Sequence, residues 1–172
     1  MTLYRDNNGN AWFSDITLDS DGTPIDDAEG DFSIGDWANR VEVTGATNAS
    51  PIVITAPGHT FQNGDRVLIV GVRGNKVANG PHTVAGVSGN TFQLSGTAGT
   101  DDFLANEGTE KPQAVPIMAG GDDITMAYVG RKLLGAFPDS VNIEEGRQYL
   151  FFGRITNYGT QIERLETATK RK

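Results

Sequence analysis

Short runs of β-forming residues, each ended by glycine, asparagine, aspartate or proline, limit most strongly how this chain can fold. The stretch FQNGDRVLIVGVRGNKVANG, residues 61–80, shows the pattern, because Asn63-Gly64 precedes one apolar run and Asn79-Gly80 precedes an alternating one. Asparagine and glycine tolerate the positive φ that tight turns between strands require. Glycine supplies 22 of the 172 residues, so turns of this kind recur along the chain.

Ten β-strands are expected from these runs, since the runs are rich in Val, Ile, Thr, Phe and Tyr. They fall at 11–18, 40–44, 52–56, 66–70, 80–88, 91–95, 124–129, 132–136, 147–156 and 160–169. No window has an apolar stripe at helical spacing long enough for a helix. The segments DFSIGDWANR and DDFLANEG would make a turn or two at most. The sequence therefore predicts an all-β protein.

The glycines of GVRGNK raise a second possibility, a loop that cradles phosphate. Such a loop needs the spacing G-x-x-x-x-G-K-[ST] between a strand and a helix. This segment has neither the spacing nor a following helical pattern, so we interpret its glycines as turn residues.

The pattern GHTFQNGDRVLIVGVRGNKVANGPHTVAGVSGNTFQLSG carries a family resemblance. Its region, residues 47–97, resembles the small β-barrel insert of ubiquitin-activating enzymes, the first catalytic cysteine half-domain, a module that also occurs in phage and prophage proteins. The matching positions are His59, Phe61, Gly64, Asp65, Val67, Val72, Gly74, Asn79, Gly80, Thr91, Phe92 and Leu94. These are turn and core positions, so the resemblance implies a fold and no reaction. The chain has no cysteine, and the activity of those enzymes is not implied.

Two further resemblances flank this region. DSDGTPIDDAEG is similar to the first hairpin of bacterial immunoglobulin-like domains, and FPDSVNIEEGRQYLFFGRI is similar to a corner of immunoglobulin and fibronectin type III sandwiches. In that corner a tyrosine hydroxyl bonds back to the chain, and Ile143, Gly146 and Tyr149 have the matching spacing. The resemblances imply an immunoglobulin-like β-sandwich of residues 1–45 and 106–172. A small β-barrel of residues 46–105 would be inserted in one of its loops, which surface turns tolerate.

The charge balance restricts the partners. A net charge of −8 argues against general nucleic-acid binding, which needs a surplus of Lys and Arg. The basic tail Lys170, Arg171 and Lys172 could contact nucleic acid or an acidic partner locally, although such tails are more often simply solvated. No apolar run is long enough to span a membrane, and the start lacks the apolar core of a secretory signal. We therefore expect a product of the host cytoplasm with no membrane partner.

The acidic residues between 15 and 31 could bind a hard cation such as calcium. An EF-hand alignment on Gly22 fits poorly, because its closing acid falls on Ala28, one position before Glu29. A solvated loop is therefore favoured, with Asp19, Asp21 and Glu29 as weak metal candidates. No cofactor is expected.

Catalytic signals are equally weak. His59 and His82 are the only histidines, and no G-x-S-x-G nucleophile motif accompanies them, so structural roles are favoured and no enzyme is predicted. Trp12 and Trp37 could line a sugar-binding face. Core or interface roles are favoured for both, because tryptophan is a common interface anchor.

These observations predict a non-enzymatic structural or assembly protein of a phage virion, located at the capsid surface, the head–tail neck or the tail. Its partners would be other virion proteins and further copies of itself, because β-modules of this kind present broad faces for symmetric packing. Two alternatives remain open, a carbohydrate-binding or adhesin-like module and a small hydrolase. The binding module is preferred, because immunoglobulin-like folds often serve that role.

Overall fold

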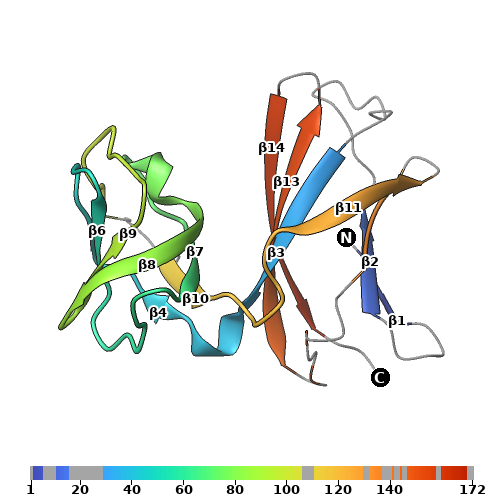
Figure 1. The fold of residues 1–172 in the computed structure, drawn as a ribbon, viewed down its shortest axis with the longest axis horizontal. Coiled ribbons are helices and arrows are strands. Elements are labelled where there is room, and N and C mark those ends of the chain that lie inside the picture. The colour runs from blue at the N-terminus through green and yellow to red at the C-terminus, as the bar shows by residue number, and fades with distance from the viewer. Residues whose placement is uncertain are drawn as a thin grey trace. The chain divides into compact units, whose positions relative to one another are not determined.

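The structure is a computed structural model that describes residues 2–5, 11–15, 29–105, 111–129, 132–136, 141, 144, 147–157 and 160–169. The described chain is all-β, as predicted, and its only helical segments are the two 3-10 turns η1 (Trp37–Asn39) and η2 (Lys76–Ala78) (Figure 1). None of its helices is long and apolar enough to cross a membrane.

The chain divides into two compact units. The first unit comprises residues 1–34 and 118–172, and the second comprises 35–117. The second unit extends beyond the range 46–105 expected for the insert, because strands on both sides of that range pair with its sheet.

The first unit has one seven-stranded sheet with the order β1-β2-β12-β11-β3-β13-β14. Its strands are β1 (Thr2–Arg5), β2 (Ala11–Asp15), β3 (Glu29–Asp36), β11 (Ile124–Val129), β12 (Lys132–Ala136), β13 (Gln148–Asn157) and β14 (Thr160–Thr169). The last two pair antiparallel over their whole length, from Gln148 opposite Thr169 to Asn157 opposite Thr160. Strand β14 therefore ends the sheet as a long edge strand.

The second unit has a seven-stranded sheet with the order β4-β10-β7-β8-β9-β6-β5. Its strands are β4 (Val41–Glu42), β5 (Gly45–Ala46), β6 (Ile52–Thr55), β7 (Arg66–Val70), β8 (Gly80–Ser88), β9 (Thr91–Leu94) and β10 (Gln113–Pro116). Long β8 links two parts of the sheet, because its first half pairs with β7 and its second half pairs with β9.

The sheet of the second unit closes on itself. Strands β4 and β5 are successive parts of the segment 41–46, and β4 pairs with β10 while β5 pairs with β6. Between them, the Val43 N–H donates to the Pro112 carbonyl and the Thr44 N–H donates to the Thr55 carbonyl. The two ends of the strand order thus lie on one short segment, which is bonded to β10 and Pro112 in its first part and to β6 in its second part.

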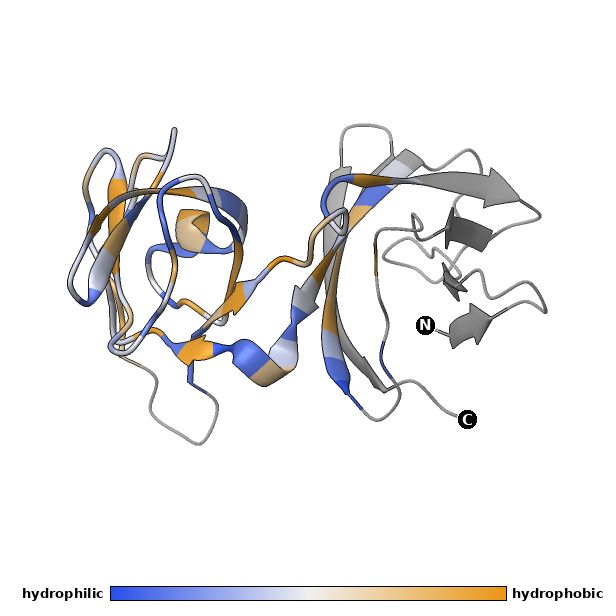
Figure 2. Cartoon of the chain, turned by 60° about the horizontal axis from the view of Figure 1, so that its bottom comes forward, coloured by the Kyte–Doolittle hydropathy of each residue, from blue (hydrophilic) through white to orange (hydrophobic). Residues whose placement is uncertain are grey.

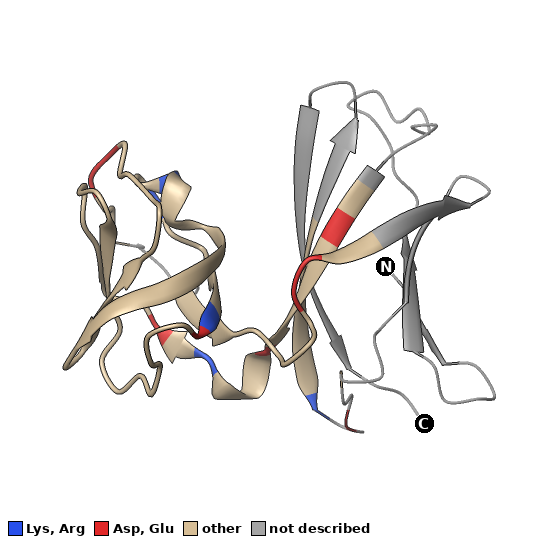
Figure 3. Ribbon diagram, in the orientation of Figure 1, with Lys and Arg blue, Asp and Glu red and all other residues tan. Residues whose placement is uncertain are grey.

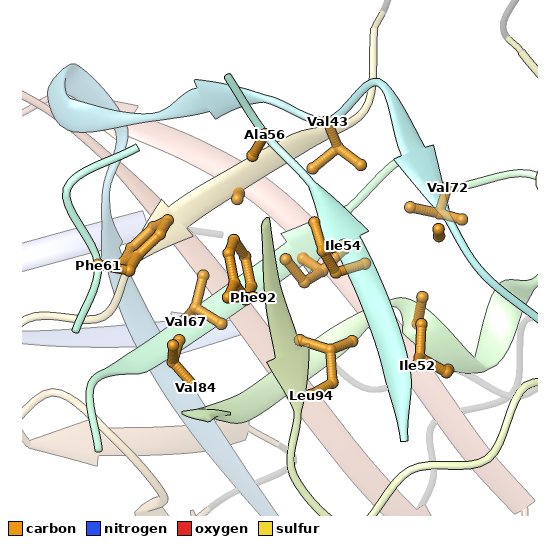
Figure 4. Packing of buried hydrophobic residues seen from close by; sticks show 14 residues of the cluster. Val43, Ile52, Ile54, Ala56, Phe61, Val67, Val72, Val84, Phe92 and Leu94 are labelled. Atoms are coloured by element: carbon orange, nitrogen blue, oxygen red, sulfur yellow. The ribbon is translucent and has the colours of Figure 1, made fainter. Parts of the chain in front are cut away.

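Apolar residues at alternate positions fill the inside of this closed sheet. Ile52 and Ile54 of β6 are fully buried, as are Phe92 and Leu94 of β9, whereas the residues that alternate with them within the two strands are half-exposed. Figure 4 shows these side chains converging with Phe61 and Val67. Figure 2 shows hydrophobic colour concentrated on the strands of this unit. Burying each such side chain contributes about 1.5–3 kcal/mol.

The chain leaves and re-joins the first unit at neighbouring positions. In the first unit, the Ile34 N–H donates to the Gly121 carbonyl at 2.6 Å and the Ile34 carbonyl accepts from the Met118 N–H at 2.9 Å. In the second unit, Gly35 and Ile117 form an antiparallel bridge. The outgoing segment at residues 34–35 is therefore paired with the returning segment at residues 117–118.

Four strands, β1, β3, β5 and β10, fall outside the ranges expected from the sequence. Strand β3 falls on EGDFSIGD, where we expected at most a helical turn. Its residues 32–35 are all buried, so the alternation that marks a half-exposed strand is missing. Strand β10 falls on QAVP, where no strand was expected, and Pro116 is its last residue.

Candidate functional site

The predicted tyrosine contact is present in the first unit. The Tyr149 side chain is only 1% exposed, and its hydroxyl accepts a hydrogen bond from the Glu144 N–H at 2.7 Å. Arg147 forms an exposed ion pair with the Glu144 carboxylate at 3.0 Å. Ile143 and Gly146, the other two residues of the expected corner, lie outside the described residues. The contact anchors the chain just before β13.

Polar side chains inside the second unit mostly hold its loops. Asn75 is fully buried, and its Nδ2 donates to the Thr47 carbonyl at 2.9 Å while its Oδ1 accepts from the Thr100 N–H at 3.3 Å. Asn79 makes two hydrogen bonds to the main chain of Val72. These residues replace strand pairing where the chain turns, so we assign them to structure.

His59 lies among aromatic rings, not among groups that could share a proton. Its ring centroid is 5.7 Å from that of Phe61 and 5.1 Å from that of Phe92. Both ring nitrogens are buried, and neither has a hydrogen-bond partner in the described part of the chain. The other histidine, His82, contacts the Ala78 carbonyl through Nε2 at 3.1 Å. These surroundings agree with the structural roles expected for both residues.

The weak metal candidates are not brought together by what the structure describes. Asp19 and Asp21 lie outside the described residues, and Glu29 is the first residue of β3, placed by its backbone alone. Within the described ranges, no cluster of three or more His, Asp or Glu residues could hold a metal ion.

Trp37 lies on η1 and is half-buried. The Arg40 guanidinium covers its ring, 4.6 Å from the centroid, and also donates to the Trp37 carbonyl at 2.9 Å. Asp36 caps this turn by accepting from the Ala38 N–H at 3.2 Å. One indole face is thus occupied by a cation and is not free for stacking on a sugar. Trp12 lies on β2 opposite Tyr4, and Lys170, Arg171 and Lys172 lie outside the described residues.

The second unit has a shallow open depression of about 340 Å³. It is lined by Ser50, Pro51, Ala85, Gln93, Ser95, Gly96, Thr97 and Ala98. The Thr97 hydroxyl fixes one wall, because it donates to the Leu94 carbonyl at 2.7 Å and accepts from the Ile52 N–H at 3.1 Å. The Ser50 hydroxyl donates to the Thr97 carbonyl at 3.3 Å. No lining residue was a sequence-based candidate, since none belongs to a recognisable motif.

Comparison with protein-family models, curated proteins and solved structures gives no match for this chain.

Proposed function

We propose that this chain is a non-enzymatic structural or assembly protein of a phage virion, at the capsid surface, the neck or the tail. It acts through contacts with other virion proteins and with its own copies. We further propose that the first unit is an immunoglobulin-like β-sandwich and that the second is a small β-barrel inserted in it. The Tyr149–Glu144 contact supports the first assignment, and the closure of the second sheet supports the other.

The observation that carries the proposal is the long edge strand β14. Its ten residues pair with β13 on one side, and no other described strand pairs with it. The unpaired backbone groups of an edge strand are a ready template for a strand of another chain. Proline, β-bulges, charged side chains and very short length are common ways to block such pairing. The strand TQIERLETAT is ten residues long and has no proline or glycine, and its charged residues are of both signs, so they can oppose one another in a second copy.

The sequence of β14 fits pairing with a second copy. A two-fold axis perpendicular to an antiparallel pair places one residue of the strand opposite its own copy. The longest overlap is reached when that residue is Arg164 or Leu165. Centring on Arg164 would oppose two like charges, which is unfavourable. Centring on Leu165 places Leu165 opposite Leu165 and Arg164 opposite Glu166 on both sides, so we propose this register.

The use of polar residues supports a structural protein over an enzyme. The buried polar side chains of the described core are Ser33 and Asn75. Ser33 donates to the Asp122 carboxylate at 2.8 Å beside a turn, and Asn75 bonds to main-chain groups. Both contacts stabilise loops.

The mass of the protein in solution tests this proposal. Light scattering at two concentrations should give an oligomer with an even number of copies, because the proposed contact is two-fold. A strict monomer at both concentrations would contradict self-association through β14, which is the inference on which the proposal rests.

A further inference from the structure

Two long stretches of the second unit contain no Asp, Glu, Lys or Arg. They are residues 43–64 and 77–100, in a chain whose charged residues make up 21% of the total. These stretches contain β5, β6, β8 and β9, four neighbouring strands of the closed sheet. Figure 3 shows β6, β8 and β9 without acidic or basic colour. Protein surfaces usually carry charges of both signs throughout, so this charge-free surface needs an explanation.

The outward positions of these strands carry no charge and mix small apolar with neutral polar residues. Because Ile52, Ile54, Phe92 and Leu94 point into the core, the residues between them face outward. The strand registers place Val53, Gln93 and Ala85 side by side, and Thr55 beside Thr91. The depression described above lies where this surface meets the turns at 50–51 and 95–98.

Among the polar side chains that line the depression, Gln93 is the best placed to bind a ligand. Its side chain lies over Gly86, where a Cβ atom would be 2.7 Å from the Gln93 Cδ and Oε1. Gly86 has a φ of +53° at the irregularity where the pairing of β8 with β9 shifts. A glycine at this position therefore leaves the room that the carboxamide occupies. Gln93 makes no side-chain hydrogen bond within the described chain, so its donor and acceptor are available to a ligand.

We propose that the depression around Gln93 binds a neutral saccharide. Hydroxyl groups need partners that both donate and accept, which the Gln93 carboxamide and the Ser95 hydroxyl provide, while the Ser50 oxygen can accept a further hydrogen bond. Pro51, Ala85 and Ala98 offer apolar contact to the carbon-bound hydrogens of a sugar ring. The volume of about 340 Å³ lies at the small end of the range for ligand pockets.

Other ligand classes fit less well. Anionic ligands, including nucleic acid, need cations, and the lining has none. Peptides that extend a sheet need a free edge, whereas β6 and β9 each lie between two strands, and each half of β8 already pairs with a strand. Protein interfaces are enriched in aromatic residues, Met and Arg, which are absent from the lining.

The test is binding of the full chain to an array of neutral hexose and N-acetylhexosamine oligosaccharides beside sialylated and uronate-containing ones. We expect neutral glycans to bind, with an affinity that does not change with salt concentration because no charge is involved. Gln93→Ala should weaken binding about tenfold through loss of hydrogen bonds. Gln148→Ala is the matched control, since Gln148 is exposed in the first unit.

A second variant distinguishes the loss of a binding contact from a loss of folding. Ser95 is exposed, so Ser95→Glu should leave the fold intact while placing a charge at the rim of the depression, and it should also abolish binding. The proposal is overturned by binding to acidic glycans alone, by an absence of neutral-glycan binding, or by binding that neither variant changes. None of these outcomes alters the mass in solution, so failure here is distinct from failure of the assembly proposal.

Discussion

Asn79 pairs with the main chain of Val72 in the way that a neighbouring strand would. Its Oδ1 accepts from the Val72 N–H at 2.9 Å, and its Nδ2 donates to the Val72 carbonyl at 3.0 Å. Val72 is only 3% exposed, so these main-chain groups have little access to water. One side chain thus closes the loop between β7 and β8.

Asn79→Asp should destabilise the second unit. The aspartate keeps the shape but loses the donor, which leaves the Val72 carbonyl without its partner and lowers the free energy of unfolding by about 1–3 kcal/mol. Denaturant unfolding can be followed in a Trp12→Phe background, where Trp37 is the remaining tryptophan and reports on this unit. Asn90→Asp, at an exposed turn, should change stability by less than about 0.5 kcal/mol. Equal stability of the two variants would contradict the prediction.

Tyr149→Phe should destabilise the first unit by about 1–2 kcal/mol, because the Glu144 N–H loses its acceptor in a partly buried position. Glu144→Ala is the control. It removes the exposed pair with Arg147 but keeps the main-chain donor, so its effect should be within about 0.5 kcal/mol. Unfolding in a Trp37→Phe background leaves Trp12 as the reporter. The interpretation fails if Glu144→Ala is the more damaging change.

His59→Phe should be tolerated or slightly stabilising. The imidazole nitrogens are buried and have no hydrogen-bond partner among the described residues, and a buried unpaired polar group costs about 1–3 kcal/mol. Phenylalanine keeps the ring contacts with Phe61 and Phe92, although its larger ring offsets part of the gain. Thermal unfolding would measure the difference. A large loss of stability would mean that His59 has a polar partner.

Leu165→Cys should form a disulfide-linked dimer under mild oxidation. The proposed register puts residue 165 opposite its own copy, with Cβ atoms about 4.5–5.5 Å apart. The chain has no cysteine of its own, so any crosslink must come from the new one. Glu163→Cys is the register control, because the two copies of residue 163 would lie about 13 Å apart along the strands. Non-reducing gel electrophoresis separates the outcomes, and efficient crosslinking of Glu163→Cys would show that the register is wrong.

The fold class and the central strands could be predicted from the sequence because their signals are local. Strands β7 and β8 coincide with their expected ranges, since glycine and asparagine turns bound them on both sides. Strand β3 escaped prediction because its burial depends on neighbours distant in sequence, including the Ser33–Asp122 contact.

The same distinction between local and long-range signals applies to the site residues. The contact of the Tyr149 hydroxyl could be expected from the spacing that carried the resemblance, whereas its partner, the Glu144 N–H, is a main-chain group that any residue would supply. The depression around Gln93 could not be predicted, because it depends on a local irregularity in strand pairing and on turns that meet only in the folded chain. The absence of charge along 43–64 and 77–100 was visible in the sequence and would have indicated this surface.

The pairing of segment 34–35 with segment 117–118 has a consequence for how the sequence can change in evolution. Ile34 and Met118 are hydrogen-bonded neighbours, so a short hairpin turn between them could replace residues 35–117 with the loss of only the last two residues of β3 from the first sheet. The bridge between Gly35 and Ile117 likewise brings the ends of the second unit together. The second unit could therefore be exchanged as a whole: recombination at the two ends of the gene segment for residues 35–117 could remove it, duplicate it or substitute another module.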